Sequence, residues 1–151
     1  IEGFTGVHVE RSTALVIRLR NAFIANDLEQ VMRILQSVFA DIPYFLHDKY
    51  PEKFFHAAIH LLFTYMGIRI HSEVCTSDGR VDSMVETPTH VYILEYKLDK
   101  SPEEALEQIK RKKYYRSAWE LGKPVVGVGV NFSSETKNIE GWVAEEMANA
   151  E

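Results

Sequence analysis

Two carboxylates and an amine lie within Gly79–Leu98 at a spacing that suits metal-assisted chemistry. Glu95 and Lys97 are two positions apart, so alternation along a strand sends both side chains to one face, about 6–7 Å apart. Asp82 lies in the preceding extended segment, where a hairpin would set it beside Glu95. Carboxylate oxygens suit a hard divalent cation such as Mg²⁺ or Mn²⁺. Lys97 would then orient a water molecule or stabilise developing negative charge.

The same residues have a simpler interpretation. A Glu95–Lys97 ion pair on a solvated strand face would give the same spacing, and charged pairs at strand ends are common. Spacing alone leaves both interpretations open.

Two strands joined by a short turn would position these residues. The segment from Gly79 and the segment Val91–Leu98 are the strands, and Thr87-Pro88-Thr89 breaks between them. Arg80, beside the turn that opens the first strand, is a candidate phosphate contact, although arginines there are usually solvated. Glu86 has the same parity as Asp82 but lies further from the predicted site.

Helices and further strands surround this pair. Helical spacing covers residues 9–25 and 28–39, the second helix being capped by Asn26 or Asp27, and Pro51 begins a helix that Gly67 ends. Residues 68–74 alternate in polarity as a strand does, and Ser101 and Pro102 begin a helix that runs to about Leu121. The apolar run 125–132 predicts a buried strand. Residues 139–143 predict an edge strand, and the tail from Ala144 is expected to fray. This order predicts an α/β fold with a central mixed sheet flanked by helices.

The helix from Pro51 carries His56 and His60 on one face. Two histidines at this spacing can chelate a metal, but packing of the imidazoles is the alternative, because the glutamate of a zinc-protease motif is absent. Glu73, in the strand that follows, would either reach the site or face solvent.

The charge pattern bears on nucleic-acid binding. A net charge of −5 does not favour strong non-specific binding to nucleic acid. Lys110-Arg111-Lys112-Lys113 is nevertheless a local basic cluster, and Lys110, Lys113 and Tyr114 are candidate contacts to nucleic acid. A solvated helix face, paired with Glu103 and Glu107, explains the cluster equally well.

Composition indicates a soluble globular domain. The 151 residues are 46% apolar and 26% charged, with no run long enough to cross a membrane, and we expect no signal peptide. Because Cys75 is the single cysteine, an internal disulfide is excluded and a reducing, cytoplasmic compartment is favoured. The chain begins at Ile1, so we expect it to be a fragment or a processed form.

Asp82 followed after a spacer by Glu95-Tyr96-Lys97 resembles the PD-(D/E)xK nuclease superfamily. The string Tyr-Ile-Leu-Glu-Tyr-Lys, with Ala105-Leu106-Glu107-Gln108-Ile109 and Lys113-Tyr114 after it, is similar to one branch of that superfamily. That branch occurs in bacterial proteins as a C-terminal domain behind an AAA-ATPase-like domain. The resemblance covers about Pro51 to the C-terminus. It divides the chain into a helical extension, residues 1–50, and a nuclease-like core, residues 51–151.

The resemblance implies a restriction-endonuclease-like core that hydrolyses phosphodiester bonds of nucleic acid with Mg²⁺ or Mn²⁺. DNA is the expected substrate, and RNA is the alternative. The residues it implies are Asp82, Glu95, Lys97 and Gln108 for catalysis, and Asp82, Glu95, the backbone carbonyl of Tyr96 and His56 for the metal. Gln108 would orient the attacking water or a phosphate, with simple exposure on the helix as the open alternative, while His60 is expected to pack. The alternative is a domain that keeps the fold without catalysis and binds nucleic acid or protein.

Overall fold

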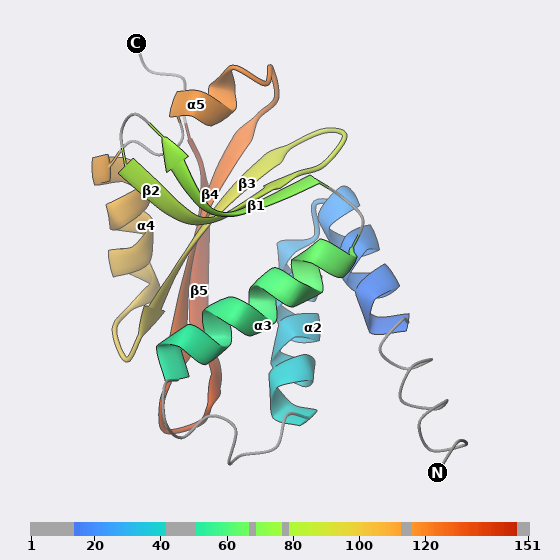
Figure 1. Cartoon of the computed structure of the whole chain (residues 1–151), viewed down its shortest axis with the longest axis vertical. Helices are drawn as coiled ribbons and strands as arrows, with labels where there is room; N and C mark the ends of the chain where they lie inside the picture. Colours follow the sequence, from blue (N-terminus) through green and yellow to red (C-terminus); the bar gives the residue numbers. More distant parts are fainter. Residues whose placement is uncertain (1–13, 42–50, 67–68, 77–78, 113–115, 148–151) are drawn as a thin grey trace.

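A mixed β-sheet with helices on both faces forms the centre of the molecule (Figure 1). The structure is a computed structural model. It describes the backbone of residues 14–41, 51–66, 69–76, 79–112 and 116–147, and the side chains of residues 14–41, 57–66, 83–111 and 118–147. None of the helices in these ranges combines the length and the apolar composition that a membrane span requires.

The elements follow the predicted order. A helix over residues 14–24 comes first. The labelled elements are α2 (Leu28–Asp41), α3 (Pro51–Tyr65), β1 (Arg69–Thr76), β2 (Gly79–Glu86), β3 (Val91–Leu98), α4 (Pro102–Lys112), α5 (Arg116–Trp119), β4 (Val125–Ser133) and β5 (Asn138–Glu146). The predicted helix from Ser101 to about Leu121 is thus described as α4 and α5, with residues 113–115 outside the described residues. Gly67 and residues 9–13 also lie outside them.

The described strands are ordered β1-β2-β3-β4-β5 in one sheet. β3 and β4 are parallel, and every other neighbouring pair is antiparallel. Parallel neighbours need a long crossover, which here contains α4 and α5. The prediction of a mixed sheet flanked by helices is therefore confirmed.

Side-chain caps begin two of the helices. Oδ1 of Asp27 accepts a hydrogen bond of 3.2 Å from the Gln30 amide at the start of α2. Oγ of Ser101 accepts one of 3.1 Å from the Glu104 amide, while Oε2 of Glu104 accepts one of 3.4 Å from the Ser101 amide. This reciprocal pair is a capping box, which fixes where α4 begins.

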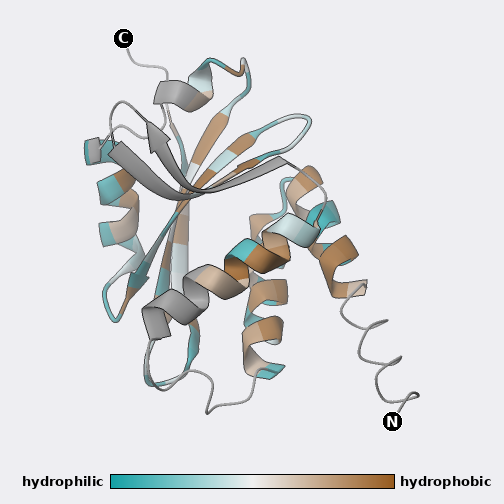
Figure 2. Ribbon diagram, in the orientation of Figure 1, coloured by the Kyte–Doolittle hydropathy of each residue, from teal (hydrophilic) through white to brown (hydrophobic). Residues whose placement is uncertain are grey.

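The two faces of β3 enter two different hydrophobic clusters. Tyr92, Leu94 and Tyr96 face the larger cluster, which α2, α3 and the first helix cover. Val91 and Ile93 face the smaller cluster, to which α4 and α5 contribute. Figure 2 shows apolar residues concentrated along α2, in keeping with its burial against the sheet. Alternation therefore assigns the odd-numbered positions of β3 to the α4 side.

The first helix packs directly on the sheet. The ring of Phe23 lies edge-on to Phe63 of α3 and to Tyr92 of β3, with 5.4 Å between ring centroids in both pairs. The hydroxyl of Tyr92 also donates a hydrogen bond of 2.5 Å to Oδ1 of Asn26. Residues on both sides of position 50 thus share one hydrophobic cluster. The division of the chain at that position stays a prediction.

The end of β5 corrects one expectation for the described part of the tail. Residues 144–147 do not fray, because Ala144 pairs with Val128 and β5 continues to Glu146. The Met147 amide then donates to the carbonyl of Val125 at 2.7 Å, and Met147 is buried. The sequence did not predict this pairing, because the glutamates at the end of β5 interrupt the apolar pattern of a strand.

Candidate functional site

Glu95 is the buried carboxylate of the site. It lies in the second half of β3 and is only 4% exposed. Its neighbours Leu94 and Tyr96 face the larger hydrophobic cluster, so Glu95 points to the opposite face, toward α4. A carboxylate at this depth is costly unless polar groups compensate it.

Gln108, on α4, supplies such a group. Its Nε2 donates a hydrogen bond of 2.5 Å to Oε1 of Glu95. Its Oε1 accepts a hydrogen bond from Nζ of Lys97. Because an amide has one donating and one accepting end, Gln108 joins the carboxylate and the ammonium in one charge-assisted chain. Glu95 and Lys97 therefore share a face, and Gln108 is part of their environment rather than simply exposed.

The described pairing of β2 and β3 ends just before Asp82 and Glu95. Ser83 pairs with Leu94 in the antiparallel register of the two strands. Asp82 and Glu95 are therefore each one residue beyond the last described pair. The side chain of Asp82 lies outside the described residues. The hairpin that the sequence predicts around these two positions is present.

Of the remaining candidate metal ligands, the structure describes the side chains of some and not of others. The ring of Tyr96 packs with Phe132 in the larger cluster, 6.0 Å between centroids, so only its backbone carbonyl is a candidate ligand. The side chains of His56 and Glu73 lie outside the described residues. The expectation that His60 packs is wrong, because the residue is exposed on α3, where only its carbonyl is bonded by Thr64.

Of the candidate contacts to nucleic acid, Lys110 is the residue whose side chain the structure describes. Its Nζ pairs with Oε2 of Glu145 on β5 at 2.7 Å, and this hydrogen bond raises the pKa of Lys110. The pair places Lys110 on the β5 side of α4. The side chain of Arg80, and residues Lys113 and Tyr114 altogether, lie outside the described residues.

The end of β3 carries a polar connection that the sequence did not predict. Oδ1 of Asn131, on β4, accepts a hydrogen bond of 2.9 Å from the Lys100 amide, and its Nδ2 donates to Oε2 of Glu140 at 3.2 Å. Asn131 is 3% exposed and is the register partner of Lys97. Its signal in the sequence is one amide residue within the apolar run 125–132.

Asp99, between β3 and α4, is tied to the β4–β5 turn. Its carboxylate accepts hydrogen bonds from the amide of Ser134 at 2.9 Å and from the hydroxyl at 2.5 Å. These bonds lower the pKa of Asp99. The backbone of Asp99 is left-handed, with φ of 55°. Figure 2 shows hydrophilic residues at this connection.

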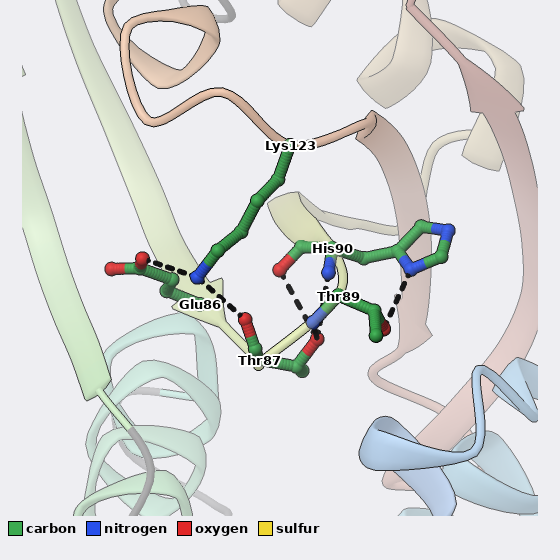
Figure 3. Close-up of polar contacts among 5 residues, drawn as sticks. All are labelled: Glu86, Thr87, Thr89, His90 and Lys123. Atoms are coloured by element: carbon green, nitrogen blue, oxygen red, sulfur yellow. Dashed lines mark hydrogen bonds and ion pairs between the residues drawn. The ribbon is translucent and has the colours of Figure 1, made fainter.

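A separate polar cluster lies at the other end of β3 (Figure 3). Nζ of Lys123 contacts Oε2 of Glu86 at 2.7 Å and donates to the carbonyl of Thr87 at 2.9 Å. Glu86 is thereby engaged away from Glu95. An open cavity of about 580 Å³ is adjacent, lined by Trp119, Gly122, Lys123, Pro124, Val125, Glu146 and Met147.

Of the side chains that the structure describes, Glu95 is the candidate ligand for a hard cation. Among the described side chains, no three histidine, cysteine, aspartate or glutamate residues are grouped to hold a metal ion. Glu95 nevertheless presents a buried carboxylate that accepts a hydrogen bond from Gln108, whose other end binds the Lys97 ammonium. Two carboxylates from adjacent strands are a sufficient protein contribution for Mg²⁺, which keeps several water ligands.

Comparison with known proteins agrees with this geometry. Residues 50–142 match the family model of the PD-(D/E)XK nuclease superfamily. The chain is also 29% identical over 136 residues to an Azotobacter chroococcum mcd 1 protein described as "Uncharacterized protein in vnfD 5'region". The matched region is 86% of this chain and 26% of that protein, so the chain spans about a quarter of its relative's length. No solved structure matches the chain. Since the family match covers more than half of its residues, the chain belongs to the PD-(D/E)XK nuclease superfamily.

Proposed function

We propose that this domain hydrolyses phosphodiester bonds of nucleic acid with Mg²⁺ or Mn²⁺. DNA is the proposed substrate, and RNA is the alternative. The observation that carries the proposal is the chain Glu95–Gln108–Lys97, which holds a buried carboxylate and an ammonium on one face beside β2. Membership of the nuclease superfamily supports it.

Asp82 and Glu95 are the proposed metal ligands, with the carbonyl of Tyr96 and the imidazole of His56 as further donors. The metal would supply Lewis acidity and an activated water. Lys97 would stabilise negative charge on the phosphate, because an ammonium held at a fixed position needs little reorganisation. Gln108 would hold Lys97 and Glu95 in register for this role.

Nucleic acid would approach along α4 and the β2 turn. Arg80, Lys110, Lys113 and Tyr114 are the proposed contacts. Lys110 is engaged with Glu145, so binding there would exchange one anionic partner for another. Such phosphate contacts predict affinity that falls with salt.

We further propose that the domain belongs to a longer cytoplasmic protein of bacterial type with an AAA-ATPase-like domain upstream. The length of its Azotobacter relative, about four times the matched region, supports a multidomain setting. In this arrangement residues 1–50 join the two parts and residues 51–151 form the nuclease core.

The test compares wild type with Asp82→Ala and Glu95→Gln. Binding of Mn²⁺ and Mg²⁺ is measured by calorimetry, and cleavage is measured on plasmid and on single-stranded DNA. Glu107→Gln is the matched control, since Glu107 precedes Gln108 on α4 and is exposed. We expect both site variants to lose metal binding and cleavage while the control keeps them.

The second candidate function is nucleic-acid or protein binding without catalysis. The net charge of −5 and the engagement of Lys110 by Glu145 weigh against a nucleic-acid substrate, and so favour protein binding within this alternative. DNA binding by wild type without cleavage, and with a metal affinity equal to that of Asp82→Ala, would establish this alternative and refute the nuclease proposal.

A further inference from the structure

Gly129, on β4, lies where α4 comes closest to the sheet. A Cβ at this position would meet the carbonyl oxygen of Pro102 at 2.2 Å and the amide nitrogen of Leu106 at 2.7 Å. Both atoms belong to the α4 backbone, so no side-chain rotation relieves the contact. The glycine therefore lets the first turns of the helix lie directly on β4.

This contact is next to the site. In the parallel register of β3 and β4, Gly129 is the partner of Glu95. Neighbouring strands are about 4.8 Å apart. The contact of Gly129 with the α4 backbone, which we call the seat of the helix, is therefore adjacent to the buried carboxylate. Gln108 follows Leu106 by two residues on the same helix and reaches Glu95 at 2.5 Å.

Asn131 completes the seat two residues along β4. It binds the Lys100 amide at 2.9 Å, just before the capping box of α4. Gly129 thus sets the height of the helix above the sheet, and Asn131 fixes where the helix begins. Neither residue reaches the Gln108 amide by any described contact, so both act through the position of α4.

We propose that Gly129 is a positioning residue of the site, which sets the reach of Gln108 between Glu95 and Lys97. The proposal rests on the proposed nuclease function. A carbon atom needs about 3.5 Å from its neighbours, so a Cβ at Gly129 would lift α4 by about 1 Å. The Gln108–Glu95 hydrogen bond would then stretch to the limit of a useful contact.

The experiment compares wild type with Gly129→Ala, Gln108→Ala and the double variant. Cleavage gives kcat and KM, and the side-chain amide resonances of Gln108 are followed by NMR. We expect Gly129→Ala to lower kcat by about 10- to 100-fold, leave KM unchanged and shift the Gln108 resonances. In the Gln108→Ala background the same change should lower kcat no further.

Two matched glycines provide controls. A Cβ at Gly127 would meet the flexible end of Met147 at 2.9 Å and of Leu106 at 3.3 Å, and a Cβ at Gly141 would have its nearest contact at 3.6 Å. We expect Gly127→Ala and Gly141→Ala to keep kcat and the Gln108 resonances. An unchanged Gln108 resonance in Gly129→Ala, or an equal loss of kcat in both backgrounds, would overturn the proposal.

The outcome stays decisive if Gly129→Ala does not fold. Asn131→Ala loosens the same seat without adding an atom, so a shifted Gln108 resonance supports the proposal and an unshifted one refutes it. If wild type cleaves no nucleic acid, the nuclease proposal fails, and the NMR comparison still decides whether Gly129 positions Gln108.

Discussion

The amide of Gln108 donates a hydrogen bond of 2.5 Å to the carboxylate of Glu95, from a helix that follows the strand in sequence and covers it in space. The same side chain accepts a bond from Lys97. An amide is the side chain that can serve a carboxylate and an ammonium at once, without adding a charge of its own. The two charged groups are therefore held apart and in a fixed order along β3.

Truncation of Gln108 tests this relationship directly. Hydrogen bonds to charged groups contribute about 1.5–3 kcal/mol, so Gln108→Ala should lower the cleavage rate by about 10- to 150-fold. The measurement is single-turnover cleavage of plasmid DNA with saturating Mn²⁺. Glu107→Ala, one residue earlier and exposed, should cleave at the wild-type rate. A Gln108→Ala rate within twofold of wild type would show that the amide has no part in the reaction.

The connection before α4 should respond to acid. Two hydrogen bonds from Ser134 lower the pKa of Asp99. Their contribution to stability is therefore fully present above the ordinary carboxyl pKa, about 3.9, and is lost as pH falls through the lowered pKa. Asp99→Asn suits the left-handed backbone, φ 55°, and cannot ionise. We expect its urea midpoint to lie below that of wild type at pH 7, and the difference to shrink below about pH 4.

Glu135→Gln is the control for this pH experiment, since it removes an exposed carboxylate from the same turn. Its midpoint should follow that of wild type through the acid range. A difference between wild type and Asp99→Asn that stays constant from pH 7 to acid would contradict the assignment.

Tyr92 links the first helices to the strand that carries Glu95. Tyr92→Phe removes the hydrogen bond to Asn26, and we expect a loss of about 1 kcal/mol in the free energy of unfolding at pH 7. Burial raises the pKa of Tyr92 to about 12. Stability from the neutral phenol is thus lost as pH rises above about 10, the ordinary value. The variant should lose less stability than wild type between these values.

Urea titrations at pH 7 and at alkaline pH measure both effects. Tyr65→Phe is the control, because Tyr65 is 72% exposed on α3. Equal alkaline losses in wild type and Tyr92→Phe would show that the phenol does not contribute in this way.

The strands of the site were readable from the sequence because they are local patterns. The run Val91–Leu98 is bounded by a proline-containing turn and forms β3 with those limits. Ser101 and Pro102 predict the start of α4, and the capping box forms there. Such signals depend on residues a few positions apart, so one sequence is enough to find them.

The contact between α4 and Gly129 could not be predicted from the sequence, because it depends on the register between β3 and β4, which a crossover connects. Gly127 and Gly129 appear in the sequence as interruptions of an apolar run, and only pairing with β3 shows that Gly129 lies beside Glu95. The bridge made by Gln108 likewise depends on the height of a helix above a strand 13 residues away. Tertiary contacts of this kind leave no periodic signal.

The ion pair of Lys123 and Glu86 offers a comparison of partly buried and exposed charges. Its side chains are 26% and 15% exposed, against 67% for both partners of the Arg33–Glu29 pair. Exposed pairs of this kind contribute about 0.3–0.5 kcal/mol. A double-mutant cycle with Lys123→Met and Glu86→Gln should give a coupling energy of about 1–2 kcal/mol, because water screens the partly buried pair less.

The same cycle with Arg33→Met and Glu29→Gln is the matched reference, measured by urea unfolding at low and at high salt. We expect added salt to reduce the Arg33–Glu29 coupling by a larger fraction than the Lys123–Glu86 coupling. The Lys123 ammonium also binds the Thr87 carbonyl, so it holds the β2–β3 turn against the strand entry at Val125. Coupling energies that are equal in the two cycles would mean that the Lys123 contacts add nothing beyond a surface pair. The register of β2 and β3 from Ser83 and Leu94 onward would then be maintained by the strand pairing alone.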